Sequence, residues 1–196
     1  LSYVKDTQFS DLPHLRPPSL LIKAKTMTLD AVTLRNLEIV KTVGDSSKDT
    51  LFATLNRTST AGGSRKLKDW LLRPLHDLKK LNERHEAVQE LFDNTLSRRE
   101  IKDILKGFQD VERLVSRLGH GSISPRDLDS LRTSLNTLKD LKQFLSEEPL
   151  KSKLMKRLVK SIDPHKQVSK KLEEALVEEP PLVLRDGGIF KKGYSK

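Results

Sequence analysis

The chain has 196 residues, enough to bury a hydrophobic core, and 33% of them are charged. It contains no cysteine, which excludes disulfides, thiolate zinc sites and a cysteine nucleophile, and it has no apolar run of about 18 residues that could span a membrane. The net charge of +10, from 37 lysines and arginines against 27 aspartates and glutamates, fits an anionic partner, nucleic acid above all, and equally a solvated surface of mixed charge.

The first 29 residues are predicted to contain the end of a helix, a proline-rich linker and a short strand. Residues 2–9 favour the end of a helix, which the following prolines stop because proline lacks a backbone donor and restricts the residue before it. From Ile22 to Leu29 apolar and polar residues alternate roughly with a period of two, which predicts a short strand. The chain begins without Met and without the regions of a signal peptide, so we expect a fragment of a longer protein.

Capping residues and apolar spacing predict several helices between residues 30 and 93. A helix over Ala31–Val40 is followed by a polar loop, a short helix that holds Leu51 and Leu55, and a helix that Pro74 ends. The predicted N-caps are Asp30, Asp49 or Thr50, Thr60 and Asp77. The apolar stripe predicted for the longest of these helices consists of Leu78, Leu81, His85, Val88 and Phe92.

One long helix dominates the second half of the prediction. It starts at Ser124-Pro125, an N-cap followed by proline at the first helical position. Leucines that step by three or four residues predict about six turns: Leu128, Leu131, Leu135, Leu138, Leu141 and Leu145. Shorter helices are predicted around residues 101–108, 111–118, 150–162 and 168–176. Pro180-Pro181 ends this region, and strands are predicted over 182–185 and 189–194.

No group of residues has the spacing of a catalytic or metal site. The five histidines are too scattered for helical metal-ligand spacing, and His85, on an apolar stripe, is better explained as a packed core residue than as a ligand. The segment 62–66 (GGSRK) superficially resembles a phosphate loop, but it lacks the Gly-Lys-Ser/Thr ending and the strand that should precede it. We therefore predict no catalytic residue, no cofactor site and no metal site in this chain.

The basic residues occur as scattered doublets without interleaved aromatic residues, so a stacking platform for single strands is not expected. Each doublet is better explained as solvated surface than as a phosphate clamp. The doublets are Lys79-Lys80, Arg98-Arg99, Lys170-Lys171 and Lys191-Lys192, of which Lys191 and Lys192 are weak candidates for DNA contact. The predicted structural core consists of Leu67, Trp70, Leu71, Leu114, Leu128, Leu131 and Leu135, with Trp70 as a buried anchor.

Two long segments of the sequence resemble the core region of the MutS family of DNA mismatch-repair proteins. The first combines residues 27–39 (MTLDAVTLRNLEI) with residues 58–75 (TSTAGGSRKLKDWLLRPL), and the second combines DVERL at 110–114 with SISPRDL at 122–128. The two ends of the chain, with RDGGIFKKGY at 185–194, resemble the flanks of the same region, so the similarity covers the whole chain in order. Ala61, where the family often has proline, and Gly62 depart from the pattern.

The resemblance implies a mostly α fold: an elongated helical core and lever bundle with short β segments near both ends. Residues 1–20 would be the exit from a connector domain and a linker, residues 21–180 the core and lever, and residues 181–196 a strand leading into an absent DNA clamp. It also implies a parent protein, bacterial by its C-terminal motif, that is a cytoplasmic, nucleoid-associated homodimer.

That parent would recognise mismatches in double-stranded DNA, use ATP and magnesium in a C-terminal ATPase domain absent from this chain, and work with a MutL-type repair protein. This chain would join the DNA end to the ATPase end of the parent, without being an enzyme itself. One alternative is a free-standing basic helical module that binds nucleic acid directly. Another is an enzyme with a cryptic site. Flanking sequence that encodes a mismatch-reading domain and a P-loop ATPase would distinguish the first hypothesis from the others.

Overall fold

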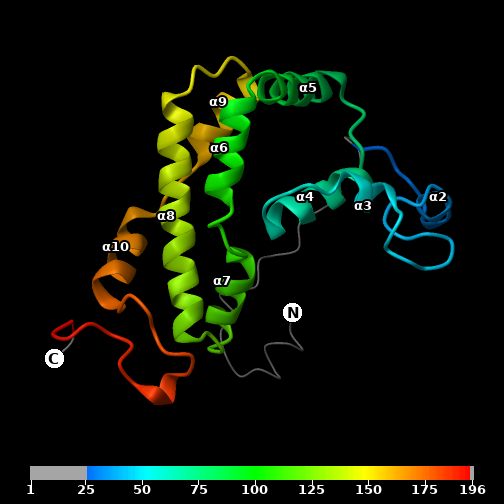
Figure 1. The fold of residues 1–196 in the computed structure, drawn as a ribbon. Helices are drawn as coiled ribbons and strands as arrows, with labels where there is room; N and C mark the ends of the chain where they lie inside the picture. Colours follow the sequence, from blue (N-terminus) through cyan, green and yellow to red (C-terminus); the bar gives the residue numbers. More distant parts are fainter. Residues whose placement is uncertain (1–25, 195–196) are drawn as a thin grey trace, which may run out of the picture.

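The computed structural model describes residues 26–194, and these are mostly helical, which confirms the predicted fold class. The longest helix runs the length of an elongated helical body, with the other elements arranged along it (Figure 1). The helices of the described residues are α2 (Ala31–Asn36), α3 (Leu51–Leu55), α4 (Ala61–Leu72), α5 (Leu78–Asp93), α6 (Thr95–Leu105), α7 (Val111–Gly119), α8 (Pro125–Glu147), α9 (Lys153–Ser161), α10 (Lys166–Ala175) and the 3₁₀-helix η2 (Leu184–Asp186). Among them, none has the length and apolar character needed to cross a membrane.

Helix α8 begins with the signal that the sequence predicts. The Ser124 hydroxyl accepts a hydrogen bond from the Asp127 N–H at 3.1 Å, and the Asp127 carboxylate accepts one from the Ser124 N–H at 2.9 Å. This reciprocal pair satisfies two backbone donors that a helix start otherwise leaves free. Pro125 follows at the first helical position, where its fixed φ suits the helix. With 23 residues, α8 is roughly 34 Å long at 1.5 Å per residue.

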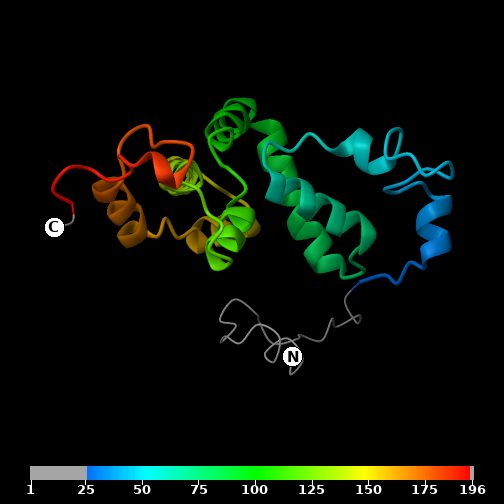
Figure 2. The same cartoon turned by 90° about the horizontal axis from the view of Figure 1, so that it is seen from below.

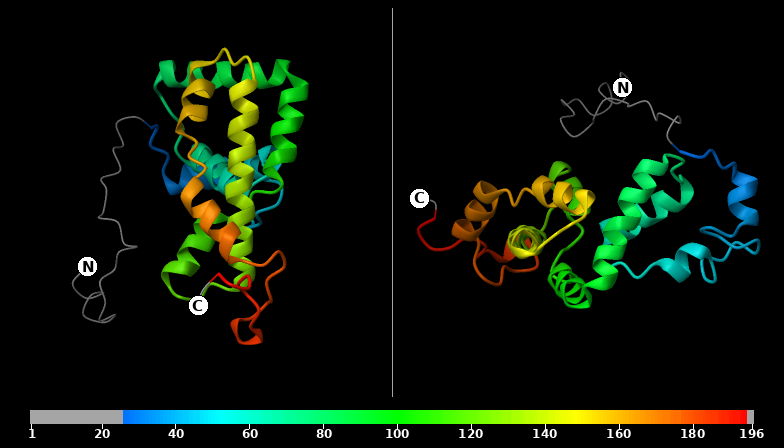
Figure 3. Two further views of the ribbon diagram at one scale, coloured as in Figure 1. Left: turned by 90° about the vertical axis from the view of Figure 1, so that its left-hand side faces the viewer. Right: turned by 90° about the horizontal axis from the view of Figure 1, so that it is seen from above.

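Two apolar clusters hold α8, one toward each end. Near its C-terminal end, Leu141 and Leu145 pack with side chains from α5 and α9, namely Ala87, Met155 and Val159. Near its N-terminal end, Leu131 and Leu135 pack against Leu114 of α7. Helix α5 lies across one end of the bundle, and α7 lies along α8 toward the other (Figures 1 and 3). The two clusters therefore fix α8 against different neighbours.

Residues 26–75 form an arm beside this bundle, and the arm lies on the opposite side of the molecule from α10 (Figure 2). The predicted caps Asp30 and Thr60 are confirmed, and Thr50 rather than Asp49 caps α3. Helix α2 ends at Asn36, four residues before the predicted end. Glu38 adopts φ 48°, in the left-handed region that an α-helix cannot continue through.

The predicted short strands are wrong for the residues that can be compared. In place of the strand over 182–185 the chain forms the 3₁₀-helix η2, which begins four residues after Pro180. Thr26 forms an isolated bridge with Leu75, and Phe190 forms one with Leu176. A single bridge leaves most backbone groups without a ladder partner, so neither segment becomes a strand. The predictions for residues 2–9, the proline-rich segment after them and residues 22–25 fall outside the described residues.

The predicted apolar stripe of α5 does not face the core. Leu78 is 75% exposed and Phe92 is 69% exposed, whereas Ala87, on another face of the same helix, is buried. His85 on this stripe is exposed too, so its predicted packing in the core is wrong. The spacing correctly identifies an apolar face, but the described residues supply no cover for it.

The burial of the predicted core residues is uneven. Leu114, Leu131 and Leu135 are buried, and Leu67, Leu71 and Leu128 are half-buried. Trp70 is 37% exposed, so the expectation of a fully buried anchor is wrong. The reason is its position on α4, where the side chain lies at the edge between the arm and α5 instead of inside either cluster.

Gly107 offers a test of how closely the segment after α6 approaches α8. A Cβ at this position would lie 2.8 Å from the Thr137 hydroxyl, which is buried and donates to the Thr133 carbonyl at 3.0 Å. We expect Gly107→Ala to lower the free energy of unfolding by about 1–3 kcal/mol because the hydroxyl must move from its partner.

The matched control is Gly62→Ala in α4, where an added Cβ meets no atom within 4 Å. It should leave stability unchanged or raise it by up to about 1 kcal/mol. Chemical denaturation measures both variants. Equal effects of the two substitutions would contradict the close approach of Gly107 to α8.

Candidate coupling joint and nucleic-acid surface

A cluster of ion pairs connects the arm to the helical bundle. Arg65 of α4 donates from its two terminal nitrogens to the two carboxylate oxygens of Asp110 at 2.9 and 2.8 Å. The same guanidinium lies 2.6 Å from a carboxylate oxygen of Glu112. Because Arg65 lies in the first half of α4 and Asp110 caps α7, this contact links two helices whose paired residues are 45 positions apart. We call Arg65, Asp110 and Glu112 the coupling joint.

The electrostatics of the coupling joint follow from this geometry. The hydrogen-bonded guanidinium of Arg65 lowers the pKa of the Asp110 carboxyl below its ordinary value of 3.8, although partial burial acts in the opposite direction. The hydrogen bond to the Asp110 carboxylate in turn raises the pKa of the Arg65 guanidinium. The side chains are 47% and 28% exposed, so solvent screens the pair, and its contribution to stability is small. The joint is specific in geometry and weak in energy.

A second contact between the arm and the bundle involves Trp70. The Arg84 guanidinium of α5 lies 3.8 Å from the centre of the Trp70 ring, within the range of a cation–π interaction. Desolvation lowers the pKa of Arg84. Within the arm, the Met27 N–H donates to the Pro74 carbonyl at 2.7 Å. With its ring face covered by Arg84, Trp70 serves as a contact between helices.

A groove of about 580 Å³ opens beside Trp70, between the end of α4, the start of α5 and α9. Its charged lining residues are Asp77, Lys79, Lys80, Glu83, Arg84 and Arg157. Arg157 donates to Glu83 at 3.1 Å, which ties α9 to α5 across the groove. Cations outnumber carboxylates here, so the groove favours an anionic neighbour.

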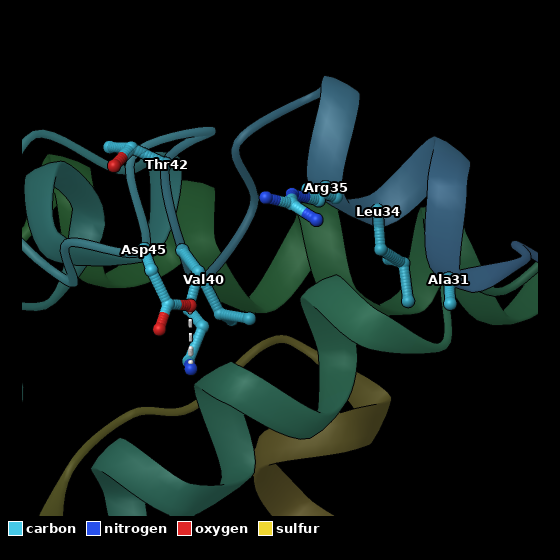
Figure 4. Close-up of a pocket in the computed structure, with 7 residues that line it drawn as sticks. Ala31, Leu34, Arg35, Val40, Thr42 and Asp45 are labelled. Carbon is cyan, nitrogen blue, oxygen red and sulfur yellow. Dashed lines mark hydrogen bonds and ion pairs between the residues drawn. The ribbon is translucent and has the colours of Figure 1, made fainter.

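A second groove, of about 540 Å³, lies between α2 and the loop that follows it (Figure 4). Its charged side chains already have partners: Lys41 pairs with Asp45 at 2.8 Å, and Arg35 donates to the Val43 carbonyl at 3.1 Å. The hydrogen bond from Lys41 lowers the pKa of Asp45. Because these groups already have partners in the same loop, the groove is better explained by loop geometry than by ligand binding.

The segment 62–66 does not fit a nucleotide phosphate. It forms the first turns of α4, where the Gly63 N–H donates to the capping hydroxyl of Thr60 at 3.0 Å. A phosphate loop would point such donors at its ligand, but this one is already used by the cap. The residues present therefore do not hold ATP at this position. Among the described residues, no group of three or more His, Cys, Asp or Glu side chains could hold a metal ion.

The two lysines singled out as candidates for DNA contact lie in different surroundings. Lys191 donates its ammonium to the Glu173 carbonyl at 2.7 Å, and its N–H donates to the Ala175 carbonyl. These bonds satisfy carbonyls at the C-terminal end of α10, which is a structural task. Lys192 is exposed. DNA contact by either lysine stays a prediction.

The chain is similar in sequence to known proteins over its whole length. The family model described as MutS domain III matches residues 32–192. The chain is 40% identical over its whole length to the DNA mismatch repair protein MutS of Methanosarcina acetivorans, covering 22% of that protein. It is 39% identical to the proteins of the same name from Pelotomaculum thermopropionicum and Listeria welshimeri, covering 23% of each. The chain thus spans less than a quarter of the length of these relatives. These similar identities do not single out a bacterial source, which stays a prediction.

The coupling joint predicts a specific pH dependence. Because the pKa of Asp110 is lowered in the folded chain, the ionised carboxylate stabilises the fold above its ordinary pKa, and this contribution is lost as the pH falls through the lowered value. We expect Asp110→Asn to melt on the order of 1–3 °C below the unsubstituted chain near pH 7. The gap should close toward pH 3.

Asparagine caps helices as well as aspartate does, so this substitution removes the charge and keeps the cap of α7. Asp140→Asn, at an exposed site on α8, is the matched control and should show no such closing gap. Thermal melts of the three proteins between pH 3 and pH 7 measure the difference. A gap for Asp110→Asn that stays constant with pH would rule out a role of its charge in the joint.

Proposed function

The chain belongs to the MutS family, as its domain III, and we propose that it couples mismatch recognition to ATP hydrolysis in a longer mismatch-repair protein. The observation that carries this proposal is the match of residues 32–192 to MutS domain III. The whole proteins that the chain resembles are more than four times as long as the chain. Recognition of mismatched duplex DNA and hydrolysis of ATP with magnesium belong, in this proposal, to flanking domains. The parent protein would be a homodimer that acts in the cytoplasm at the nucleoid and works with a MutL-type partner.

The geometry supports a mechanical role for this segment. A coupling element must carry a two-state change between distant sites, which requires a stiff part and a part that can shift. Helix α8, with buried side chains along its length, is the stiff part. The coupling joint is the part that can shift, because exposed ion pairs can break and re-form at little cost.

The exposed apolar face of α5 also fits a segment of a larger protein. Leu78, Val88 and Phe92 are each at least 66% exposed, and Leu96 at the start of α6 is 79% exposed. Apolar side chains gathered on one face mark contact with another domain or chain more often than with solvent. The free-standing nucleic-acid module would have to leave this face in water, so we favour the coupling role.

An exchange experiment tests the proposal. The matching segment of the Pelotomaculum relative is replaced by this chain, and ATP turnover is measured with matched and with mismatched duplex DNA. We expect DNA-stimulated turnover within a few-fold of the unexchanged protein. Arg65→Ala in the exchanged protein should reduce this stimulation and leave basal turnover and mismatch binding in place.

Lys68→Ala, on the same helix and exposed, is the control and should leave stimulation unchanged. Loss of all stimulation in the exchanged protein, with its folding intact, would contradict the coupling role. Equal loss in the Arg65 and Lys68 variants would contradict the assignment of the joint.

The 196-residue chain by itself should bind duplex DNA weakly and without preference for a mismatch. Its net charge of +10 attracts phosphates, while no element has been identified that reads base edges or wedges a mismatch. Fluorescence anisotropy with matched and mismatched duplexes, at low and at moderate salt, measures this. Tight binding at moderate salt, or a clear preference for the mismatch, would show that mismatch reading resides in this segment.

A further inference from the structure

Four cations form one stripe along α9. Lys153, Lys156, Arg157 and Lys160 are spaced at i, i+3, i+4 and i+7, which places them on one face of the helix. All four are exposed, whereas Met155 and Val159 are buried in the cluster with α5 and α8. The helix therefore has an apolar side in the core and a basic side in solvent. We call these four residues the α9 basic stripe.

The segment that carries the stripe is strongly basic. Residues 151–162 contain five lysines and arginines and no aspartate or glutamate, a net +5 within a chain of net +10. Acidic side chains do not neutralise the stripe: within the part of the chain that the structure describes, Arg157 pairs with Glu83, and the stripe's three lysines form no ion pair. Glu90, also nearby, accepts hydrogen bonds from the backbone N–H groups of Lys151 and Ser152 instead.

Helix stability does not explain this arrangement. Cations in the first turn of a helix oppose its dipole, and like charges at i, i+3 and i, i+4 repel each other by a few tenths of a kcal/mol per pair. Helix α9 carries Lys153 in its first turn and no acidic residue there. Helix α8 shows the favourable arrangement, with Asp127 in the first turn. Lys153 in the first turn and the like charges along the stripe therefore destabilise an isolated helix, although Lys160 in the last turn favours the dipole. A polyanion would relieve the repulsion among these cations.

The surroundings of the stripe favour the backbone of a duplex over a single strand. Residues 151–171 contain no Phe, Trp or Tyr, and the ring that lines the adjoining groove, Trp70, is covered by Arg84. Without free aromatic faces the surface cannot stack unpaired bases. Across the groove from Arg157, Lys79 and Lys80 at the start of α5 extend the positive surface. Such a surface can attract phosphate groups by charge, but it has no means of binding unpaired bases.

We propose that the α9 basic stripe binds the phosphate backbone of duplex DNA. This inference rests on the proposed function, in which the parent protein is bound to DNA, and it adds a contact made by this segment itself. The four cations span about 10 Å of helix axis, a length over which duplex DNA presents about six charges. The contact is independent of sequence and of mismatches.

The test compares two triple variants of the 196-residue chain that carry the same net charge. Lys153→Gln/Lys156→Gln/Lys160→Gln removes the stripe, and Lys66→Gln/Lys68→Gln/Lys102→Gln removes three exposed helix lysines elsewhere. Anisotropy titrations with a matched duplex at several salt concentrations give the affinity and its salt slope. Far-UV circular dichroism and thermal melts verify that both variants are folded.

We expect the stripe variant to bind on the order of 10-fold more weakly at low salt, with a slope of log K against log salt reduced by about 2–3, because each lost phosphate contact removes about 0.9. The control variant should change both quantities much less. Equal losses in the two variants, or binding by the stripe variant that matches the unsubstituted chain, would overturn the proposal.

Two further outcomes are distinguishable. A chain that binds an acidic polypeptide through the stripe, and duplex DNA equally well with or without it, overturns the proposal in favour of a protein partner. A folded chain with no salt-dependent DNA binding also overturns it. Neither outcome affects the coupling role, because that role is measured by ATP turnover in the exchanged protein.

Discussion

The burial of one face of α8 is the constraint on which the other helices depend. Seven of its residues are buried, from Pro125 at the first position to Leu145 near the end. Helices α5, α7, α9 and α10 each leave apolar side chains that α8 or its clusters cover. Short helices of nine or ten residues are not stable alone in water, so α7, α9 and α10 form because this face exists. Rigidity along the long axis is a consequence of the same burial.

The arm is attached by contacts of a different kind. The Arg65–Asp110–Glu112 joint and the Arg84–Trp70 contact connect it to the bundle, and these contacts are polar or lie at the surface. Such contacts are directional, so they define a position, but each contributes little free energy. An apolar interface of the same extent would fix the arm more firmly and would resist a change of state. A stiff bundle with a weakly attached arm is therefore a reasonable construction for a coupling element.

The sequence predicts local features such as helix caps well, but it predicts poorly which elements pack against one another. Ser124-Pro125, Asp30, Thr60 and Asp77 are correct caps because capping depends on a few neighbouring residues. The strand predicted over 182–185 is wrong because a short apolar run cannot show whether a second strand is available to pair with it. The burial predicted for Trp70 and for the α5 stripe is wrong because apolar spacing marks a face without identifying what covers it. The coupling joint joins residues 45 positions apart, for which no local signal exists.

The spacing of the α9 basic stripe is present in the sequence, but only the fold gives it significance. The doublets at 79–80 and 170–171 are scattered along the chain, whereas the spacing of Lys153, Lys156, Arg157 and Lys160 has the period of a helix. Only the structure adds that Met155 and Val159 hold the opposite face in the core, so the charges cannot turn away from solvent. The stripe is thus carried on the helix that packs with α5 and α8 in one apolar cluster. A DNA contact at that place would act on the rigid bundle directly, and the arm, attached at the joint, would respond to how the bundle is held.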